Sequence, residues 1–167
     1  VLKLMESTGI GNFEGLAVAT KAPVFTPQTD DFALAVHIFK MLNRGVHPFS
    51  GDLDLDFYDL DDDDIPPAPS LNTCIREGQS PFIGTQVGYA VPDYALGLND
   101  FPFLLSEAFR RSLYDNWVEE RISARVWARL LDRYLSEAIE CPRGHLHTSQ
   151  HECPYCRGEH ALLTRLG

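Results

Sequence analysis

Apolar side chains are concentrated in one segment in the first third of the chain. They are Phe32, Leu34, Ala35, Val36, Ile38, Phe39, Met41 and Leu42. Thr29 or Asp30 can cap the start of a helix here, because their side chains accept the free N–H groups of a first turn, and Gly45 supplies a stop. Because apolar residues lie nearly all round this predicted helix, we expect it in the middle of a domain.

Three further helices are predicted downstream. Residues 70–78 form a short helix that ends at Gly78. Residues 101–114 have apolar side chains at helical spacing, namely Leu104, Leu105, Ala108, Phe109 and Leu113. Residues 123–139 begin at a capping Ser123 and carry one broad apolar stripe that includes Trp127 and Tyr134. Residues 1–29 and 84–99 keep no period, so we expect a mainly α protein with long irregular connections.

An acidic segment follows the first helix. Aspartates alternate with apolar residues from Asp52 to Leu60, and four consecutive aspartates, Asp61 to Asp64, come next. Hard oxygen ligands suit Ca²⁺, but the segment lacks the Gly and the terminal Glu of an EF-hand loop. We therefore favour a solvated acidic loop over a calcium site.

The charge balance of the 167-residue chain argues against two classes of partner. It has 14 Lys and Arg against 24 Asp and Glu, which gives a formal net charge of −10. This balance repels nucleic acid and anionic membranes, and no basic patch offsets it. Apolar runs are short and no signal peptide opens the chain, so we predict a cytoplasmic protein whose partners are proteins. Since Val1 stands first, we also expect that the natural protein begins upstream.

The clearest chemical signal lies near the C-terminus. Cys141 and His145 form a Cys-x3-His element, and Cys153 and Cys156 form a Cys-x2-Cys element shortly after it. Three cysteines and a histidine at this spacing match the four N and S donors of tetrahedral Zn²⁺, and four ligands leave no open position for catalysis. We predict a closed, structural zinc site. His147 and His151 remain alternatives for the fourth ligand, and free cysteines or a disulfide are the competing interpretations.

Other residues that could carry chemistry have simpler explanations. Cys74 lies apart from the cluster on a short amphipathic helix, which favours a core position over a reactive thiol. His37 and His47 have no Ser or Cys nucleophile beside them, so a hydrolase is disfavoured and both are interpreted as structural histidines.

Residues 30–49 resemble the F helix and following turn of eukaryotic-type protein kinases. The family form is Asp-x-Trp-Ser-Leu-Gly, an apolar helix, and then Gly-x-x-Pro-Phe; here Phe32, Ala33 and Ala35 replace the Trp, Ser and Gly, and Arg44 lengthens the turn by one residue. The resemblance implies that Asp30 bonds the backbone of the catalytic loop and that the helix anchors the lobe.

A second segment, residues 121–131, is similar to the start of the last kinase helix. Arg121-Ile-Ser-Ala followed by Trp127 and Leu131 resembles the family's Arg-Pro-Ser/Thr-Ala-x-x-Trp-x-x-x-Leu, with Ile122 in place of the proline. The sequence also resembles the bacterial kinase-like proteins associated with tellurite-resistance clusters, which similarly carry a His-Pro-Phe turn and a Cys-Pro-x-Cys zinc ribbon. The resemblance implies that Arg121 pairs with the glutamate of an Ala-Pro-Glu motif, but Ala22-Pro23-Val24 has Val at that place.

The catalytic motifs of the family are missing from the sequence. It contains no Gly-rich phosphate loop, no Val-Ala-x-Lys, no His-Arg-Asp loop and no Asp-Phe-Gly. We therefore expect a kinase-like C-terminal lobe over residues 1–139, a zinc ribbon over 140–160 and a tail over 161–167. On this interpretation ATP-Mg²⁺ would bind only to a longer parent Ser/Thr kinase. The alternative is a zinc-ribbon adaptor or pseudokinase scaffold for protein–protein interaction.

Overall fold

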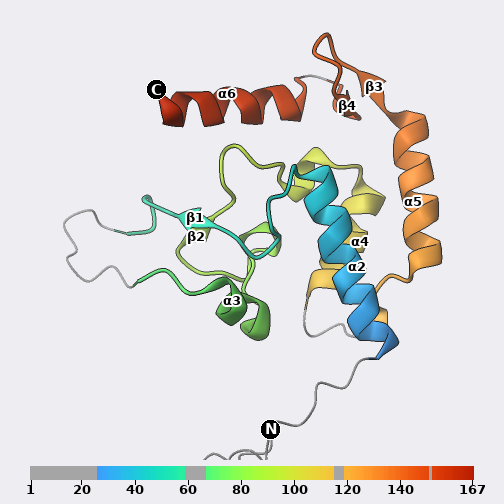
Figure 1. The fold of residues 1–167 in the computed structure, drawn as a ribbon, viewed down its shortest axis with the longest axis horizontal. Coiled ribbons are helices and arrows are strands. Elements are labelled where there is room, and N and C mark those ends of the chain that lie inside the picture. The colour runs from blue at the N-terminus through green and yellow to red at the C-terminus, as the bar shows by residue number, and fades with distance from the viewer. Residues whose placement is uncertain (1–25, 59–66, 115–118, 151) are drawn as a thin grey trace, which may run out of the picture.

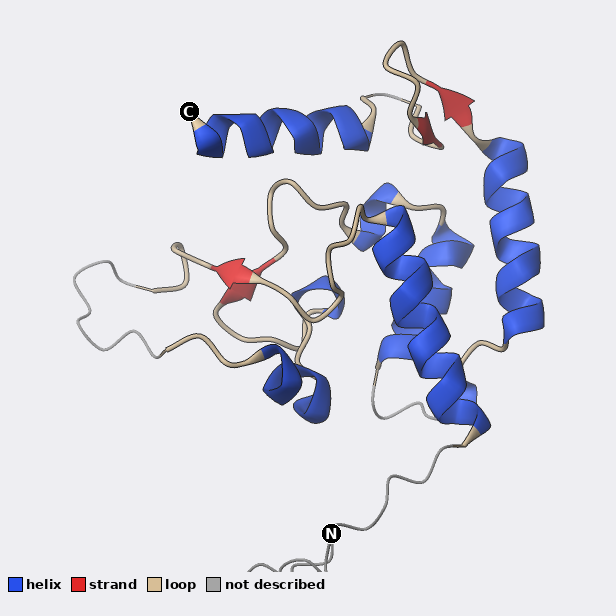
Figure 2. Ribbon diagram, viewed as in Figure 1, coloured by secondary structure: helices blue, strands red, loops and turns tan. Residues whose placement is uncertain are grey.

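The computed structural model describes residues 26–58, 67–114, 119–150 and 152–167. This part is mainly helical, as predicted (Figures 1 and 2). Its helices are α2 (Pro27–Leu42), α3 (Leu71–Glu77), α4 (Phe103–Leu113), α5 (Ala124–Glu137) and α6 (Pro154–Leu166), with short 3-10 helices η1 (Pro81–Ile83) and η2 (Leu98–Asp100). Strand β1 (Asp52–Leu53) pairs antiparallel with β2 (Tyr89–Ala90), and β3 (Ile139–Glu140) pairs antiparallel with β4 (Leu146–His147).

Helix α2 begins one turn earlier than its apolar pattern indicates. Thr26, rather than Thr29 or Asp30, is the N-cap: its hydroxyl accepts the N–H of Thr29 at 3.2 Å, and the Thr29 hydroxyl accepts the N–H of Thr26 at 3.3 Å. This reciprocal pair is a capping box. After the C-cap at Asn43, Gly45 has a φ of +91°, so the glycine supplies the predicted stop.

A chain of aromatic rings joins α2 to the rest of the core. The ring of Phe39, fully buried on α2, meets Phe82 of η1 at 4.8 Å and Phe109 of α4 at 5.2 Å, both edge-to-face. Phe109 in turn lies 4.9 Å from the buried ring of Trp127 on α5. Edge-to-face contacts of this kind add to the stabilisation from burial, so the three helices share one core.

The opposite face of α2 is open to solvent in the described structure. Asp30, Ala33, His37 and Met41 are exposed, and Met41 keeps 81% of its surface. These positions recur at helical spacing, on the side away from the buried Ala35, Val36, Ile38 and Phe39. The expectation that α2 is covered nearly all round is therefore wrong for this part of the chain, because α4 and its neighbours cover one side only.

The long connection between α2 and α4 is held by specific polar contacts. Asn43, 1% exposed, donates from Nδ2 to the Leu96 carbonyl at 2.8 Å and accepts the Leu96 N–H on Oδ1 at 2.9 Å. The hydroxyl of the buried Ser80 donates to the Pro48 carbonyl. Such contacts replace the ladder bonds that an irregular connection lacks.

Short helix α3 lies within this connection, as predicted. Ser70 caps its start by accepting the N–H of Thr73 at 3.2 Å, and Gly78 ends it with a φ of +64°. The neighbouring acidic segment contains the short strand β1. Asp61 to Asp64 lie outside the described residues, and the described aspartates of this segment form no group suited to a metal ion.

The C-terminal elements α5, β3, β4 and α6 lie along the right and upper sides of the molecule in the view of Figure 1. Helix α5 runs along one side and leads into the β3–β4 hairpin, and α6 returns across the β1–β2 side of the molecule (Figure 1). Helix α6 continues to Leu166, so residues 161–167, which we expected to be a tail, belong almost entirely to it.

Candidate metal centre

The β3–β4 hairpin positions the first two metal-ligand candidates. Cys141 follows β3 and His145 precedes β4, and the turn between them is closed by two backbone bonds, from Cys141 N to His145 O at 3.0 Å and from Gly144 N to Cys141 O at 2.8 Å. Gly144 has a φ of +82°, which other residues adopt only with strain. The glycine therefore lets the turn bring the Cys141 sulfur and the His145 ring to the same side.

The other two candidates belong to a helix rather than to a second hairpin. Cys153 is the N-cap of α6, Pro154 is its first residue, and Cys156 lies in its first turn. Residues three apart lie on one face of a helix, so both sulfurs point toward the hairpin. The zinc ribbon expected over residues 140–160 therefore has a hairpin as its first element, but its second element is the start of a helix. Pro154 favours a helix start because it has no N–H to leave unpaired.

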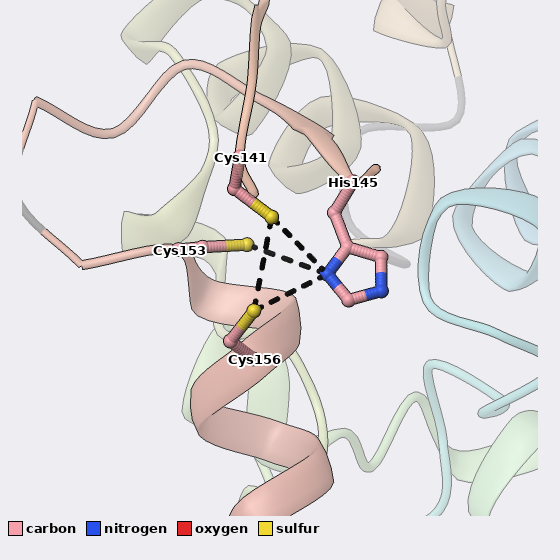
Figure 3. A group of neighbouring side chains, drawn as sticks. All are labelled: Cys141, His145, Cys153 and Cys156. Carbon is pink, nitrogen blue, oxygen red and sulfur yellow. Dashed lines mark hydrogen bonds between the residues drawn. The ribbon is translucent and has the colours of Figure 1, made fainter. Parts of the chain in front are cut away.

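The four donor atoms converge on one point (Figure 3). Nδ1 of His145 lies 3.6 Å from the sulfur of Cys141, 3.7 Å from that of Cys153 and 3.4 Å from that of Cys156. The sulfurs of Cys141 and Cys156 are 3.8 Å apart, and all four donors lie within 4.8 Å of one another.

The three nitrogen–sulfur distances and the Cys141–Cys156 separation match those of a tetrahedral metal site. Zn–S bonds of about 2.3 Å and a Zn–N bond of about 2.05 Å would place two sulfurs about 3.8 Å apart and each sulfur about 3.6 Å from the nitrogen. The cluster can therefore hold a metal ion such as zinc, with Nδ1 as the histidine donor. Among the described residues, this is the group suited to a metal.

The thiols of Cys141 and Cys156 differ in acidity. Burial raises the pKa of Cys141, but hydrogen bonds from the backbone of His145 and Arg143 and from the other two thiols outweigh it and lower the pKa to about 6. Burial and the neighbouring Cys141 and Cys153 raise the pKa of Cys156 to about 11. Like charges this close cannot all form without a cation, so the cluster favours a divalent ion.

A ring of charged residues surrounds the histidine. Nε2 of His145 lies 3.3 Å from Oε1 of Glu159 and 2.7 Å from Nη2 of Arg44. Glu159 also pairs with Arg44 and with Arg143, each at 2.7 Å. Burial alone would raise the pKa of Glu159, but these guanidinium groups hold it below its usual value. Sequence reasoning missed both Arg44 and Glu159; the signals were the extra residue in the turn after α2 and the position of Glu159 three residues after Cys156.

The structure excludes one of the two alternatives to His145 as the fourth ligand. His147 is buried on β4 and is not a member of the cluster, whereas His151 lies outside the described residues. Among the described histidines, His145 is thus the one whose ring nitrogen lies close enough to the three sulfurs to share a metal ion with them.

The remaining candidate residues lie elsewhere. Cys74 is 2% exposed and burial raises its pKa, so it is a core thiol as predicted. His47 is half-buried and its Nδ1 accepts the N–H of Phe49 at 3.3 Å, which agrees with a structural role. His37, in contrast, is exposed.

The two residues singled out by the kinase resemblance lie at the same end of α2. Asp30 is exposed on its first turn. Arg121, which precedes α5, donates from Nη1 to the Gln28 carbonyl at 2.9 Å and stacks over the Phe32 ring at 4.8 Å. Ala22-Pro23-Val24, where the family has its partner glutamate, lies outside the described residues.

Comparisons of the chain with models of protein families, with curated proteins and with solved structures found no match. None of the described helices has the length and apolarity needed to cross a bilayer.

Proposed function

We propose that this chain is the substrate-side, C-terminal lobe of a Ser/Thr protein kinase-like protein, stabilised by a structural zinc ion and not catalytic by itself. Cys141, His145, Cys153 and Cys156 would hold the zinc. With four protein donors the ion has no open position for a substrate, so its contribution would be to stability.

The surroundings of α2 carry the proposal. A kinase-like lobe is built around one apolar helix, and α2 has α4 and the Phe109–Trp127 pair on one side. Arg121 joins the segment before α5 to the start of α2 through the Gln28 carbonyl, whereas the family's arginine pairs with the glutamate of the Ala-Pro-Glu motif. The exposed side of α2, with Met41 at 81%, is the side that the catalytic half of such a lobe would cover.

The proposal also limits what the chain can do. Phosphoryl transfer needs groups that hold the nucleotide phosphates, Mg²⁺ ligands and a base, and the sequence has none of the motifs that supply them. Purified chain should therefore neither bind ATP-Mg²⁺ in the micromolar range nor transfer phosphate. Micromolar binding by this chain would refute the assignment.

A comparison of two lengths of protein tests the proposal directly. Met41→Asp places a charge on the exposed face of α2. The substitution should leave the stability of this chain unchanged, but should lower the melting temperature and the kinase activity of the full product of the native gene, where more of the lobe would cover that face. Val87→Asp, at a residue that is 75% exposed and lies outside α2, is the matched control. Equal tolerance of both substitutions in the full product would contradict the proposal.

A zinc-dependent adaptor or pseudokinase scaffold is the second candidate. The observation in its favour is the exposure of large apolar side chains on the metal-binding part of the chain, among them Leu146 at 48%, Leu163 at 66% and Leu166 at 77%. Isolated exposed leucines are common, so the group is informative only if a protein binds it. Two results together would favour this candidate: the full product of the native gene lacks the kinase motifs, and Leu163→Asp abolishes its binding to a protein partner.

A further inference from the structure

The metal centre is connected to the helical body by residues that are not ligands. Arg44 lies in the turn directly after α2, and its guanidinium reaches both Oε1 of Glu159, at 2.7 Å, and Nε2 of His145, also at 2.7 Å. It also lies over the Tyr155 ring, 5.1 Å from the centroid. Arg44 has a φ of +52°, which is uncommon for a residue with a side chain, so the turn holds this arginine in a conformation with an energetic cost.

The donor atom of His145 decides which of these contacts supports a metal ion. Since Nδ1 faces the three sulfurs, a bound ion leaves the ring hydrogen on Nε2. Oε1 of Glu159 lies 3.3 Å from Nε2, and of the two side chains that reach this nitrogen Glu159 is the one that offers an acceptor. A guanidinium has donors only, so the Arg44–Nε2 contact is a hydrogen bond only when Nε2 carries no hydrogen.

We infer that Glu159 is the positioning residue for His145 in the metal-bound protein, and that Arg44 acts through Glu159 to couple metal binding to the turn after α2. A carboxylate on the outer nitrogen fixes the tautomer and orientation of a ligand histidine, and loss of such a partner weakens metal binding about 10–100-fold. Arg44 and Arg143 fix the carboxylate in turn. The inference rests on the metal site of the proposed function but not on the kinase assignment.

The first test is zinc affinity of the full chain, measured by competition with a chromophoric chelator. Glu159→Gln should bind zinc about 10–100-fold more weakly, and Arg44→Gln several-fold more weakly. The double variant should bind no more weakly than Glu159→Gln, because Arg44 acts through Glu159. Arg165→Gln, which breaks a different α6 ion pair with Asp52 at 2.6 Å, is the matched control and should bind like the parent.

The possible outcomes distinguish a failure of this inference from a failure of the metal site on which it rests. A parent chain without zinc binding overturns the metal site itself. A second outcome is that the parent chain binds zinc through Cys141, Cys153 and Cys156. If Glu159→Gln then binds zinc as well as the parent or as Arg165→Gln does, only the inference is overturned. Fully additive losses for Arg44→Gln and Glu159→Gln would overturn the claim that Arg44 acts through Glu159.

A second measurement needs no variant and so does not depend on variant folding. Long-range ¹H–¹⁵N correlation spectra of the zinc-loaded parent report which nitrogen of His145 carries hydrogen. We expect hydrogen on Nε2, with slowed amide exchange in the turn around Arg44 compared with the metal-free protein. A zinc-loaded spectrum with hydrogen on Nδ1 instead, or equal exchange at the turn in both states, would overturn the inference.

Discussion

The hydroxyl of Tyr155 donates a 3.0 Å hydrogen bond to the backbone carbonyl of Leu42, 113 residues earlier in the chain. Leu42 ends α2 and Tyr155 lies in the first turn of α6, between two metal-ligand candidates. Burial raises the pKa of Tyr155, so its hydroxyl keeps the hydrogen that it donates. The metal-binding segment and the end of α2 are therefore joined in one packed unit.

Metal removal should loosen this unit. Structural metal sites contribute their binding free energy to folding, so a chelator should lower the melting temperature followed by circular dichroism and expose α6 to proteolysis. Cys156→Ser should have the same effect. Cys74→Ser, which changes a buried thiol outside the cluster, should leave zinc stoichiometry unchanged. Equal melting temperatures with and without zinc would show that the site does not support the fold.

Zinc binding should weaken as the pH falls. The thiolate is the ligand form of cysteine, so protons compete with the metal. At neutral pH, Cys141, with a pKa of about 6, is already ionised, whereas Cys156, with a pKa of about 11, must lose its proton to the solvent on binding. Proton release on zinc addition, followed with a pH indicator in weak buffer, should therefore be measurable and should be smaller for Cys156→Ser.

Gly158→Ala should destabilise the protein although alanine favours helices. A Cβ at Gly158 would lie 2.5 Å from the Tyr94 carbonyl oxygen, a backbone atom that cannot move aside alone. Overpacking of this kind costs about 1–3 kcal/mol, against a propensity gain of at most about 1 kcal/mol. Urea unfolding measures the difference. His160→Ala, at an exposed position of the same helix, is the control and should be neutral or slightly stabilising.

Asn43→Ala should cost more than an ordinary surface substitution. It would leave the N–H and the carbonyl of Leu96 without their partner in a buried place, and each such loss costs about 1–3 kcal/mol. We expect a loss of about 2–4 kcal/mol in the free energy of unfolding. Asn99→Ala, at an exposed asparagine, provides the comparison. A loss no larger than that of Asn99→Ala would mean that water satisfies Leu96.

His47 should give the fold part of its acid sensitivity. Burial, and then the charges of Lys40 and His37, lower its pKa from 6.5. The unfolded chain therefore takes up a proton more readily, and stability is lost as the pH falls from about 6.5 through the lower folded pKa. His47→Gln should show a smaller decline in urea stability over that range than the parent does. An unchanged pH profile would show that His47 ionises equally in both states.

Local signals in the sequence predicted α2, α3, α4 and α5, but not α6, and they predicted the four metal-ligand candidates, with His147 and His151 left open as alternatives to His145. Ser70 and Gly78 bound α3, because caps and stops depend on neighbouring residues alone. Ser123 takes the N-cap position of α5 as predicted, but its side chain makes no capping hydrogen bond. The Cys-x3-His and Cys-x2-Cys spacings likewise placed Cys141, Cys153 and Cys156 together, since short turns leave few ways to arrange such donors.

Only the tertiary structure decided the features that depend on residues far apart in the chain. The exclusion of His147 from the cluster and the Arg44–Glu159 contact arise where the turn after α2, the hairpin and α6 meet, and the exposed face of α2 arises because α4 and its neighbours cover one side only. No local pattern predicts which side of an apolar helix will be covered, or which arginine will reach a histidine 101 residues away. These outcomes are set by packing, in which each element is positioned by partners distant in sequence.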